Sequence, residues 1–220
     1  MIERFAMYEL GNLRDRFGLT DGVPAGVRMN YNVSPTQLSP VIVSRDSKRL
    51  IERKMWGFLP STAKDTRSVF RYKTTTAKSE NIFDKAIWVD AIRTQRCIVP
   101  INGYYEWRKT IDGKRPFYLH AKDQALIGLA GIYSSWTNPE GEELGTFAII
   151  TAADDTHTGR SPIIISPNND SAWLDPNISD VNSIYGMLKP LSNDLLIFHK
   201  VSSDIKNIKL NNAKSLNSLD

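Results

Sequence analysis

Cysteine is almost absent from this sequence of 220 residues, in which Cys97 stands alone. A single cysteine excludes an internal disulfide and any metal site built from several thiolates. The three histidines, His120, His157 and His199, lie too far apart along the chain to indicate a histidine-rich zinc site. The sequence therefore predicts neither a bound metal nor a cofactor.

Long apolar runs are also missing. No stretch approaches the roughly 18 apolar residues of a membrane-spanning helix, and no basic start leads into an apolar run as in a secretory signal. Apolar residues nevertheless make up 41% of the chain, which is enough for a sizeable core and argues against disorder of the whole chain. These absences favour a soluble cytoplasmic protein without a membrane partner.

Charge is distributed unevenly along the chain. Residues 1–120 carry 21 Lys and Arg against 12 Asp and Glu, a net charge of +9, whereas residues 121–220 carry 7 against 12, a net charge of −5. A basic half favours an anionic partner, of which nucleic acid is the commonest. The alternative is a solvated surface whose asymmetry arose by chance.

Short runs rich in β-branched and aromatic residues predominate, and the predicted helices occur singly. Residues 39–60 predict two strands around a turn at 45–48, and the Asp-Gly pair at 112–113 predicts a second hairpin. Residues 84–95 have the apolar spacing of an amphipathic helix. Residues 61–80 are polar and lack that spacing, so we expect a loop there.

This order of elements is not an alternation of strands and helices. It favours an α+β fold with a mostly antiparallel, curved, barrel-like β-sheet and flanking helices. No linker-like change of composition divides the chain, so we predict one compact domain over residues 1–205, with a short helix at 171–176. Residues 206–220 are rich in Asn, Lys and Ser and are predicted to form a flexible C-terminal tail.

Two segments carry side chains suited to proton transfer. Glu106 lies among aromatic residues in NGYYEW (102–107), and apolar surroundings raise the pKa of a carboxylate, which suits a general acid or base. The alternative is a Glu on the solvent face of a half-buried strand. The loop at 151–162 adds His157, a natural proton shuttle, and Arg160, a natural phosphate clamp. Its alternative is a polar loop with a hydrogen-bonded His.

A basic segment, FRYKTTTAKSEN (70–81), combines Arg71, Lys73 and Lys78 with two aromatic side chains and several hydroxyls. That mixture can bind phosphates and stack on bases. A solvated basic loop would have the same composition. Arg4 lies beside the chain start, where a surface arginine is the default interpretation.

Together these segments form an ordered series that resembles the SRAP family, the SOS-response-associated peptidases, which recognise abasic sites in single-stranded DNA. The most specific piece is RCIVPINGYYEW (96–107). The series also includes RF at the chain start, YNVSPTQ (31–37), WGFLP (56–60), TAKSE (76–80), RPFYL (115–119), GLAGIY (128–133), TFAIITAA (146–153), HTGRSP (157–162), AWLD (172–175) and KVSS (200–203). The resemblance covers nearly the whole chain.

The resemblance implies a mechanism. In the family, a cysteine directly after the initiator methionine becomes the N-terminus, and its amine and thiol attack the ring-opened aldehyde of an abasic site. A thiazolidine crosslink between protein and DNA results. The peptidase in the family name refers, in its best-supported form, to self-removal of that methionine. The resemblance also implies a cytoplasmic monomer whose partner is single-stranded DNA with abasic sites, and which is nucleoid-associated when bound.

Site residues follow from the same resemblance. Glu106 and His157 resemble the catalytic Glu and His of the family, and Thr76 stands at the position of its catalytic Asn. Arg4 and Arg160 resemble its phosphate-binding arginines. The predicted DNA-binding set is completed by Lys78, Arg71, Lys73 and Trp107.

The departures from the family pattern concern the chemistry itself. Ile2 occupies the nucleophile position, and Glu3 replaces the Gly that follows it. Thr76 lacks the amide donors of Asn, and Lys78 lacks the bidentate fork of the family Arg. Thr62 stands where many members carry a second Trp that stacks on DNA. One engineered change at position 2 would not produce this set, so natural divergence is favoured.

Two groups are candidates to replace the missing thiol. Cys97 lies in an apolar run, where free cysteine behaves as a small hydrophobe, so it is a poor one. Met1 is expected to be retained because Ile2 is too large for methionine aminopeptidase. Its α-amine, with an ordinary pKa of about 7.7–8.0, could form a reversible Schiff base with the aldehyde.

Three functions stay open at this point. The first is a protein that binds abasic single-stranded DNA, with covalent chemistry absent or reduced to a reversible imine. The second is a non-catalytic single-stranded DNA-binding scaffold. The third is a peptidase or other hydrolase that uses Glu106 and His157, which has little mechanistic support because no Ser, Cys or metal ligand is placed beside them.

Overall fold

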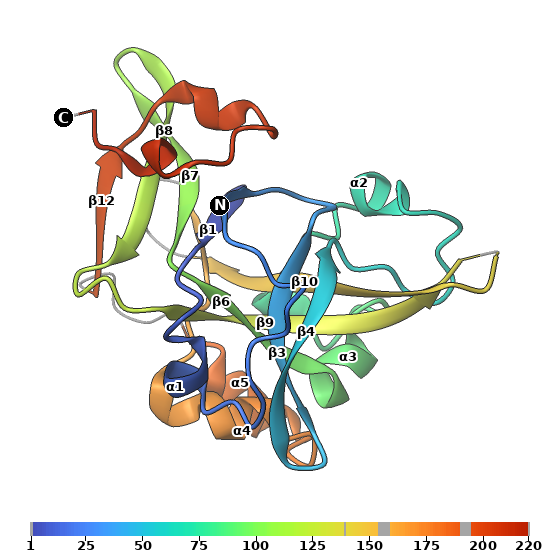
Figure 1. Cartoon of the computed structure of the whole chain (residues 1–220). Coiled ribbons are helices and arrows are strands. Elements are labelled where there is room, and N and C mark those ends of the chain that lie inside the picture. Colours follow the sequence, from blue (N-terminus) through green and yellow to red (C-terminus); the bar gives the residue numbers. More distant parts are fainter. Residues whose placement is uncertain (1, 139, 154–158, 190–194, 220) are drawn as a thin grey trace.

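Two β-sheets form the framework of the structure, a computed structural model that describes residues 2–138, 140–153, 159–189 and 195–219 (Figure 1). The strands are β1 (Arg4–Met7), β2 (Asn30–Val33), β3 (Leu38–Arg45), β4 (Lys48–Trp56), β5 (Thr76–Lys78), β6 (Arg96–Ile101), β7 (Gly103–Thr110), β8 (Gly113–Ala121), β9 (Ile127–Thr137), β10 (Glu143–Ala153), β11 (Arg160–Pro162) and β12 (Leu196–Lys200). The α-helices are α1 (Leu13–Phe17), α2 (Ser68–Tyr72), α3 (Val89–Thr94), α4 (Asp170–Leu174) and α5 (Val181–Met187). Short 3-10 helices are η1 (Ser79–Asn81), η2 (Pro167–Asn169), η4 (Ser203–Lys206) and η5 (Ala213–Leu216).

Five strands close into a barrel in the order β10-β4-β3-β6-β9, and β9 pairs with β10 to complete the ring. Only β10 and β4 run parallel within this ring. Ile42, Ile98 and Phe147, one from each of three barrel strands, are fully buried in the main core. The predicted α+β fold with a curved, mostly antiparallel sheet is confirmed.

The second sheet has the strand order β12-β8-β7-β1-β2. Its β1 lies between β2 and β7 and is antiparallel to both, with Arg4 opposite Tyr105. Successive side chains of a strand point to opposite faces. Accordingly, Phe5 packs into the main core, whereas Ala6 joins a smaller cluster with Tyr105 and Trp107. The first strand of the chain is therefore held in the interior of a sheet.

Both predicted hairpins are present. β3 and β4 are joined by Asp46 and Ser47, whose φ angles of 49° and 63° are those of the two-residue turns that match the twist of a hairpin. β7 and β8 pair as far as Thr110 and Gly113, and Gly113 has a φ of 93°, which side chains rarely allow. The sequence predicted these turns because their chemistry is local.

Two predictions from apolar spacing were wrong in extent. The helix expected at 84–95 covers only Val89–Thr94, with Trp88 as its N-cap residue. The loop expected at 61–80 contains α2, β5 and η1. β5 forms because Thr76, Ala77 and Lys78 pair in parallel with β10, a tertiary contact without a local signal. None of the described helices is long and apolar enough to cross a membrane.

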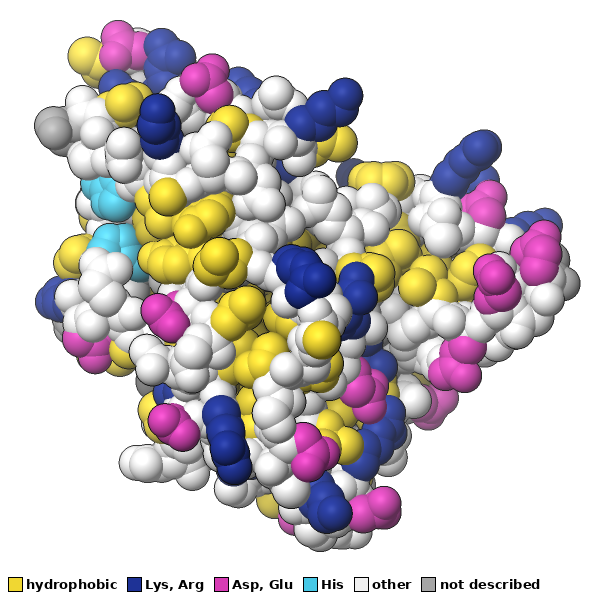
Figure 2. All heavy atoms as spheres, viewed as in Figure 1, with side chains coloured by type: hydrophobic (Ala, Val, Ile, Leu, Met, Phe, Trp, Pro, Cys, Tyr) yellow, Lys and Arg dark blue, Asp and Glu magenta, His cyan; other side chains and the backbone are white. Residues whose placement is uncertain are grey.

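The two chain halves of opposite net charge interleave in the barrel. The basic half supplies β3, β4 and β6 of the barrel, and the other half supplies β9 and β10 between them. Figure 2 accordingly shows Lys and Arg side chains interspersed with Asp and Glu across the visible face. Any site for an anion must therefore be argued from local groups.

The segment after β12 packs against the second sheet. The Nδ2 atom of Asn32, on β2, lies 3.1, 3.0 and 3.1 Å from the carbonyl oxygens of Ile205, Asn207 and Leu210. The side chain of Asn211 accepts a hydrogen bond of 2.8 Å from the backbone N–H of Tyr31. These contacts bring the segment to the edge of β2, while the domain boundary at 205 and the flexibility of 206–220 stay predictions.

Replacing Asn32 by Ala should lower the free energy of unfolding by about 1–3 kcal/mol, because the buried carbonyls that it bonds would lose their donor. Urea denaturation followed by circular dichroism measures this. Asn182→Ala is the matched control, since Asn182 is exposed on α5. Equal free energies of unfolding for the two variants would show that other contacts hold the C-terminal segment.

Candidate active site

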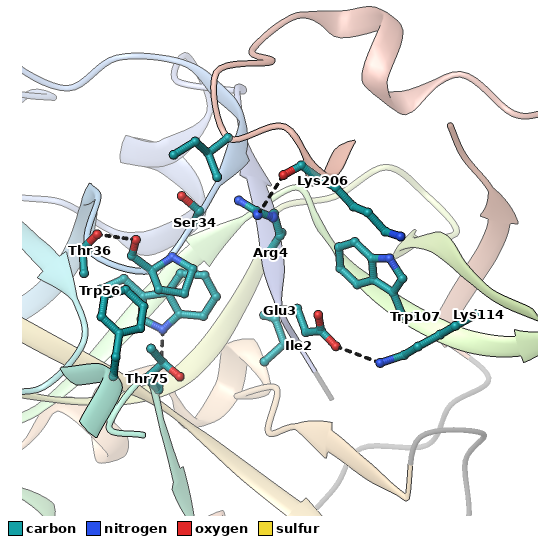
Figure 3. A pocket seen from close by; sticks show the side chains of 13 residues that line it. Ile2, Glu3, Arg4, Ser34, Thr36, Trp56, Thr75, Trp107, Lys114 and Lys206 are labelled. Atoms are coloured by element: carbon teal, nitrogen blue, oxygen red, sulfur yellow. Dashed lines mark hydrogen bonds and ion pairs between the residues drawn. The ribbon is translucent and has the colours of Figure 1, made fainter. Parts of the chain in front are cut away.

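A pocket of about 660 Å³ opens where the chain start meets the end of β4 and the C-terminal segment. Figure 3 shows its side chains converging from both sheets and from two loops. The lining residues are Ile2, Glu3, Arg4, Ser34, Pro35, Thr36, Trp56, Phe70, Thr75, Trp107, Lys114, Lys206 and Ile208. The pocket therefore combines a cationic rim with aromatic walls.

The strand pairing of β1 places the first residues of the chain in this pocket. The backbone N–H of Glu3 donates to the carbonyl of Tyr105 at 3.3 Å, which extends the β1–β7 ladder beyond Arg4. Ile2, the residue at the family nucleophile position, is 3% exposed and packs in the main core cluster. An aliphatic side chain thus occupies the inner end of the site. Met1, whose α-amine is a predicted nucleophile, lies outside the described residues.

The guanidinium of Arg4 lies in the pocket and uses only part of its hydrogen-bonding capacity. Its Nη2 donates to the backbone carbonyl of Lys206 at 3.3 Å, while its Nη1 is buried and has no hydrogen-bond partner among the described residues. Burial lowers the pKa of Arg4, and the nearby Glu3 carboxylate partly opposes that shift. A half-buried guanidinium with an unused donor nitrogen is a group that an anionic ligand can stabilise.

Ionisable side chains at the pocket give it a net positive charge. Arg4, Lys114 and Lys206 are cationic and Glu3 is anionic, which leaves a net charge of +2 on the lining residues. Nζ of Lys114 lies 3.4 Å from Oε1 of Glu3, and the two side chains are 62% and 45% exposed. This ion pair is therefore accessible from solvent at the rim.

Aromatic rings form the walls. Trp56 is fully buried at the end of β4, and its indole N–H donates to the carbonyl of Thr75 at 2.9 Å. Trp107, from β7, is 8% exposed, whereas Phe70, from α2, is 62% exposed. An exposed ring beside a cationic pocket is suited to stack on a nucleobase. The predicted DNA-binding residue Trp107 thus lines the pocket.

Glu106 does not lie on the solvent face of a half-buried strand, and its carboxylate is paired with a cation from its own strand. It is buried, and its Oε1 accepts a hydrogen bond of 2.5 Å from Nε of Arg108. The Arg108 guanidinium in turn lies 4.0 Å from the ring centroid of Phe198. Strand alternation places Glu106 on the opposite face of β7 from Trp107. The general-acid or general-base role of Glu106 stays a prediction, and its partner His157 lies outside the described residues.

Arg160 is held by a carboxylate. Nη1 and Nη2 of Arg160 lie 3.1 and 2.8 Å from the two carboxylate oxygens of Glu80, and Nη2 also donates to the Thr151 carbonyl at 2.8 Å. These hydrogen bonds lower the pKa of Glu80 to about 2. A phosphate bound by Arg160 would have to share its guanidinium with Glu80. The predicted phosphate contact of Arg160 stays a prediction.

The basic segment is divided between two regions. Arg71 lines a second pocket, of about 780 Å³, together with Thr62. Lys73 ends α2 in a left-handed conformation, and Lys78 is exposed on β5, beside the predicted catalytic Thr76. Four predicted site residues do not line the first pocket: Arg71, Lys73, Thr76 and Lys78. Their roles stay predictions.

Several lining residues were missed by the sequence analysis. Phe70 lies in the segment that was identified as basic and aromatic, so a signal for it existed. Lys114 and Lys206 had no such signal, because one follows a hairpin turn and the other lies in the predicted tail. Only the folded chain brings these two amines to Arg4.

Cys97 lies on β6 inside the barrel and is fully buried. Burial strongly raises the pKa of its thiol, so the reactive thiolate is disfavoured. The described residues contain no group of three or more His, Cys, Asp or Glu that could hold a metal ion. Cys97 is therefore an unsuitable replacement for the missing nucleophile.

Comparison with known proteins identifies the family to which this chain belongs. The family described as SOS response associated peptidase (SRAP) matches residues 1–208. The chain belongs to the SRAP family. This SRAP protein is 30% identical over 227 residues to the abasic site processing protein YoqW of Bacillus subtilis, and the alignment covers 99% of this chain and 100% of YoqW. The resemblance found in the sequence motifs is thereby confirmed.

Similarity extends to a vertebrate relative and to solved structures. This SRAP chain is 26% identical over 232 residues to the abasic site processing protein HMCES of Xenopus tropicalis, covering 89% of this chain and 68% of HMCES. A crystal structure of a Bacteroides thetaiotaomicron protein superposes with a TM-score of 0.86 at 26% identity, covering 98% of both chains. The fold is therefore shared with a close structural relative.

The Glu80–Arg160 pair makes a prediction about acid stability. Because the folded pKa of Glu80 lies near 2, below its ordinary 4.5, its contribution is complete above pH 4.5 and is lost as pH falls towards 2. We expect wild type to be more stable than Glu80→Gln at pH 7, and the difference to shrink over that acidic window. Urea unfolding at a series of pH values measures it.

Glu140→Gln is the control for this measurement, because Glu140 is exposed and has no ion pair among those described. Its difference from wild type should be small at every pH. A Glu80→Gln difference that stayed constant from pH 7 to pH 2 would contradict the assignment of the ion pair.

Proposed function

We propose that this protein recognises abasic sites in single-stranded DNA and holds the lesion in the pocket at the start of β1. The observation that carries the proposal is the buried Nη1 of Arg4, which has no partner in the described part of the chain. Membership of the SRAP family supports it, as do relatives that are named abasic site processing proteins. A DNA phosphate would supply the acceptor that Arg4 lacks.

The pocket offers complementary groups for each part of such a ligand. Arg4 and Lys206 face the backbone phosphates, whose neutralisation provides most of the affinity and makes it dependent on salt. The exposed ring of Phe70 offers a stacking surface to a flanking base. The space at the chain start accepts a sugar that has lost its base.

The family crosslink cannot form in its usual way in this chain. A thiazolidine needs an amine and a thiol on the same residue, and Ile2 has no thiol. Cys97 is enclosed in the barrel and cannot supply one. In this proposal the complex with DNA is therefore reversible, either non-covalent or an imine.

Binding measurements test the proposal. Fluorescence anisotropy with labelled oligonucleotides should show tighter binding to single-stranded DNA with a central abasic site than to intact single-stranded or double-stranded DNA. Arg4→Gln should weaken binding by about tenfold, or about 1.4 kcal/mol, and lower the slope of log affinity against log salt by about 1. Both effects follow from the loss of one phosphate contact.

Arg14→Gln is the matched control, since Arg14 is exposed on α1 and does not line the pocket. Its affinity and salt dependence should equal those of wild type. Equal affinity for intact and abasic strands would replace the proposal by a single-stranded DNA-binding scaffold. Absence of binding to single-stranded DNA at low salt would overturn both.

A further inference from the structure

The side-chain amine of Lys114 lies in the same pocket as Ile2, the residue at the position of the family's nucleophilic cysteine. Lys114 is the second residue of β8, and Figure 3 shows its side chain reaching past Trp107 towards Glu3. Its Nζ lies 3.4 Å from Oε1 of Glu3, the residue next to Ile2. The ladder hydrogen bond of Glu3 to Tyr105 fixes the backbone on one side of this contact.

Lys114 and Glu3 come from opposite sides of β7, because Lys114 lies on β8 and Glu3 directly precedes β1. β7 and β8 are paired along their whole length, with Trp107 opposite Pro116 and Lys109 opposite Lys114. β1 pairs with β7 on its other edge. The side chain of Lys114 therefore extends across β7 to Glu3. Its amine consequently lies beside the first residues of the chain.

We propose that Lys114 is an amine nucleophile that forms a Schiff base with the aldehyde of an abasic site, with Glu3 as its proton acceptor and donor. This inference rests on the proposed function, because it needs the lesion to enter the pocket. It assigns to this chain a lysine chemistry in place of the thiol and amine of an N-terminal cysteine.

The reaction is balanced without a further reactant. The neutral Nζ adds to C1′ of the ring-opened sugar, so that the C1′–N bond forms as the carbonyl π bond breaks, and one proton moves from nitrogen to oxygen. The resulting hydroxyl takes a proton from Glu3 and leaves as water, the nitrogen lone pair forms the second C1′–Nζ bond, and a protonated C1′=Nζ imine remains while Glu3 returns to its carboxylate form. Hydrolysis by water reverses the sequence.

Glu3 is placed for both proton transfers. An ammonium cannot attack, and Oε1 of Glu3 is the acceptor nearest to it in the pocket at 3.4 Å. In the proposed reaction Glu3 accepts one proton from Nζ, which leaves the neutral amine that attacks. The protonated Glu3 then donates to the departing hydroxyl.

Lys206 is the other amine in the pocket, and its position suits phosphate binding. It is exposed and has no carboxylate partner among the described ion pairs. Its own backbone carbonyl accepts from Arg4, which ties it to the phosphate-binding group. Lys114 differs from Lys206 because the carboxylate of Glu3 lies beside its amine.

Borohydride trapping tests the inference. The reagent reduces an imine to a stable secondary amine, and the full chain is incubated with labelled abasic single-stranded DNA at saturating protein, so that yield reports chemistry rather than affinity. Wild type should give a trapped adduct that maps to Lys114, recognisable because trypsin no longer cleaves after it. Lys114→Arg should reduce the adduct to the level of a reaction without protein, since a guanidinium forms no imine here.

Glu3→Gln should retain Lys114 but slow trapping by about a hundredfold, the typical contribution of a general acid–base group. Lys109→Arg is the matched control, because Lys109 is exposed on the neighbouring strand and does not line the pocket. Its yield should equal that of wild type.

The remaining outcomes separate the two proposals. An adduct that maps to Met1 or Lys206, or a Lys114→Arg yield equal to wild type, overturns the role of Lys114 and leaves lesion binding intact. Binding of abasic DNA by wild type without any trapped product does the same. Failure of abasic single-stranded DNA to bind, measured by anisotropy, overturns the proposed function and with it the role of Lys114.

Discussion

The pairing of β1 between β2 and β7 is the constraint on which the site depends. A chain terminus is ordinarily loose unless a strand or helix ties it down. Here the register that sets Arg4 opposite Tyr105 fixes both the direction and the depth of the residues that precede it. Ile2 is thereby buried, and Glu3 continues the ladder into the pocket. Without this pairing, neither the cation of Arg4 nor the carboxylate of Glu3 would have a defined position.

The pocket is an assembly of distant parts around that strand. The end of β4 contributes Trp56, the hairpin of β7 and β8 contributes Trp107 and Lys114, and the segment after β12 contributes Lys206. Arg4 links β1 to the last of these, because it donates to the carbonyl of Lys206. Its second terminal nitrogen is left unpaired, which keeps the site receptive to an anion. In the proposed function, structural hydrogen bonding and ligand recognition thus share one guanidinium.

The chain belongs to the SRAP family, but the side chain at position 2 is not the cysteine that the family resemblance predicts there. Position 2 has an aliphatic side chain, and the carboxylates that could act in catalysis carry defined partners: Glu106 is bound to Arg108, Glu80 to Arg160 and Glu3 to Lys114. The first pair joins two residues of β7, and the second joins η1 to β11. The third lies at the accessible rim of the pocket. Of these three pairs, it is the one whose two residues both line this pocket.

The sequence alone determined the family, the α+β class and both hairpins, because ordered motifs and turn residues act through short-range chemistry. It also determined that position 2 lacks a thiol. It did not determine β5, whose pairing with β10 joins residues more than seventy positions apart, or the ion pair of Glu3 with Lys114, separated by 111 positions. Such contacts depend on strand order and register, and these are decided by the packing of the whole chain rather than by any local segment.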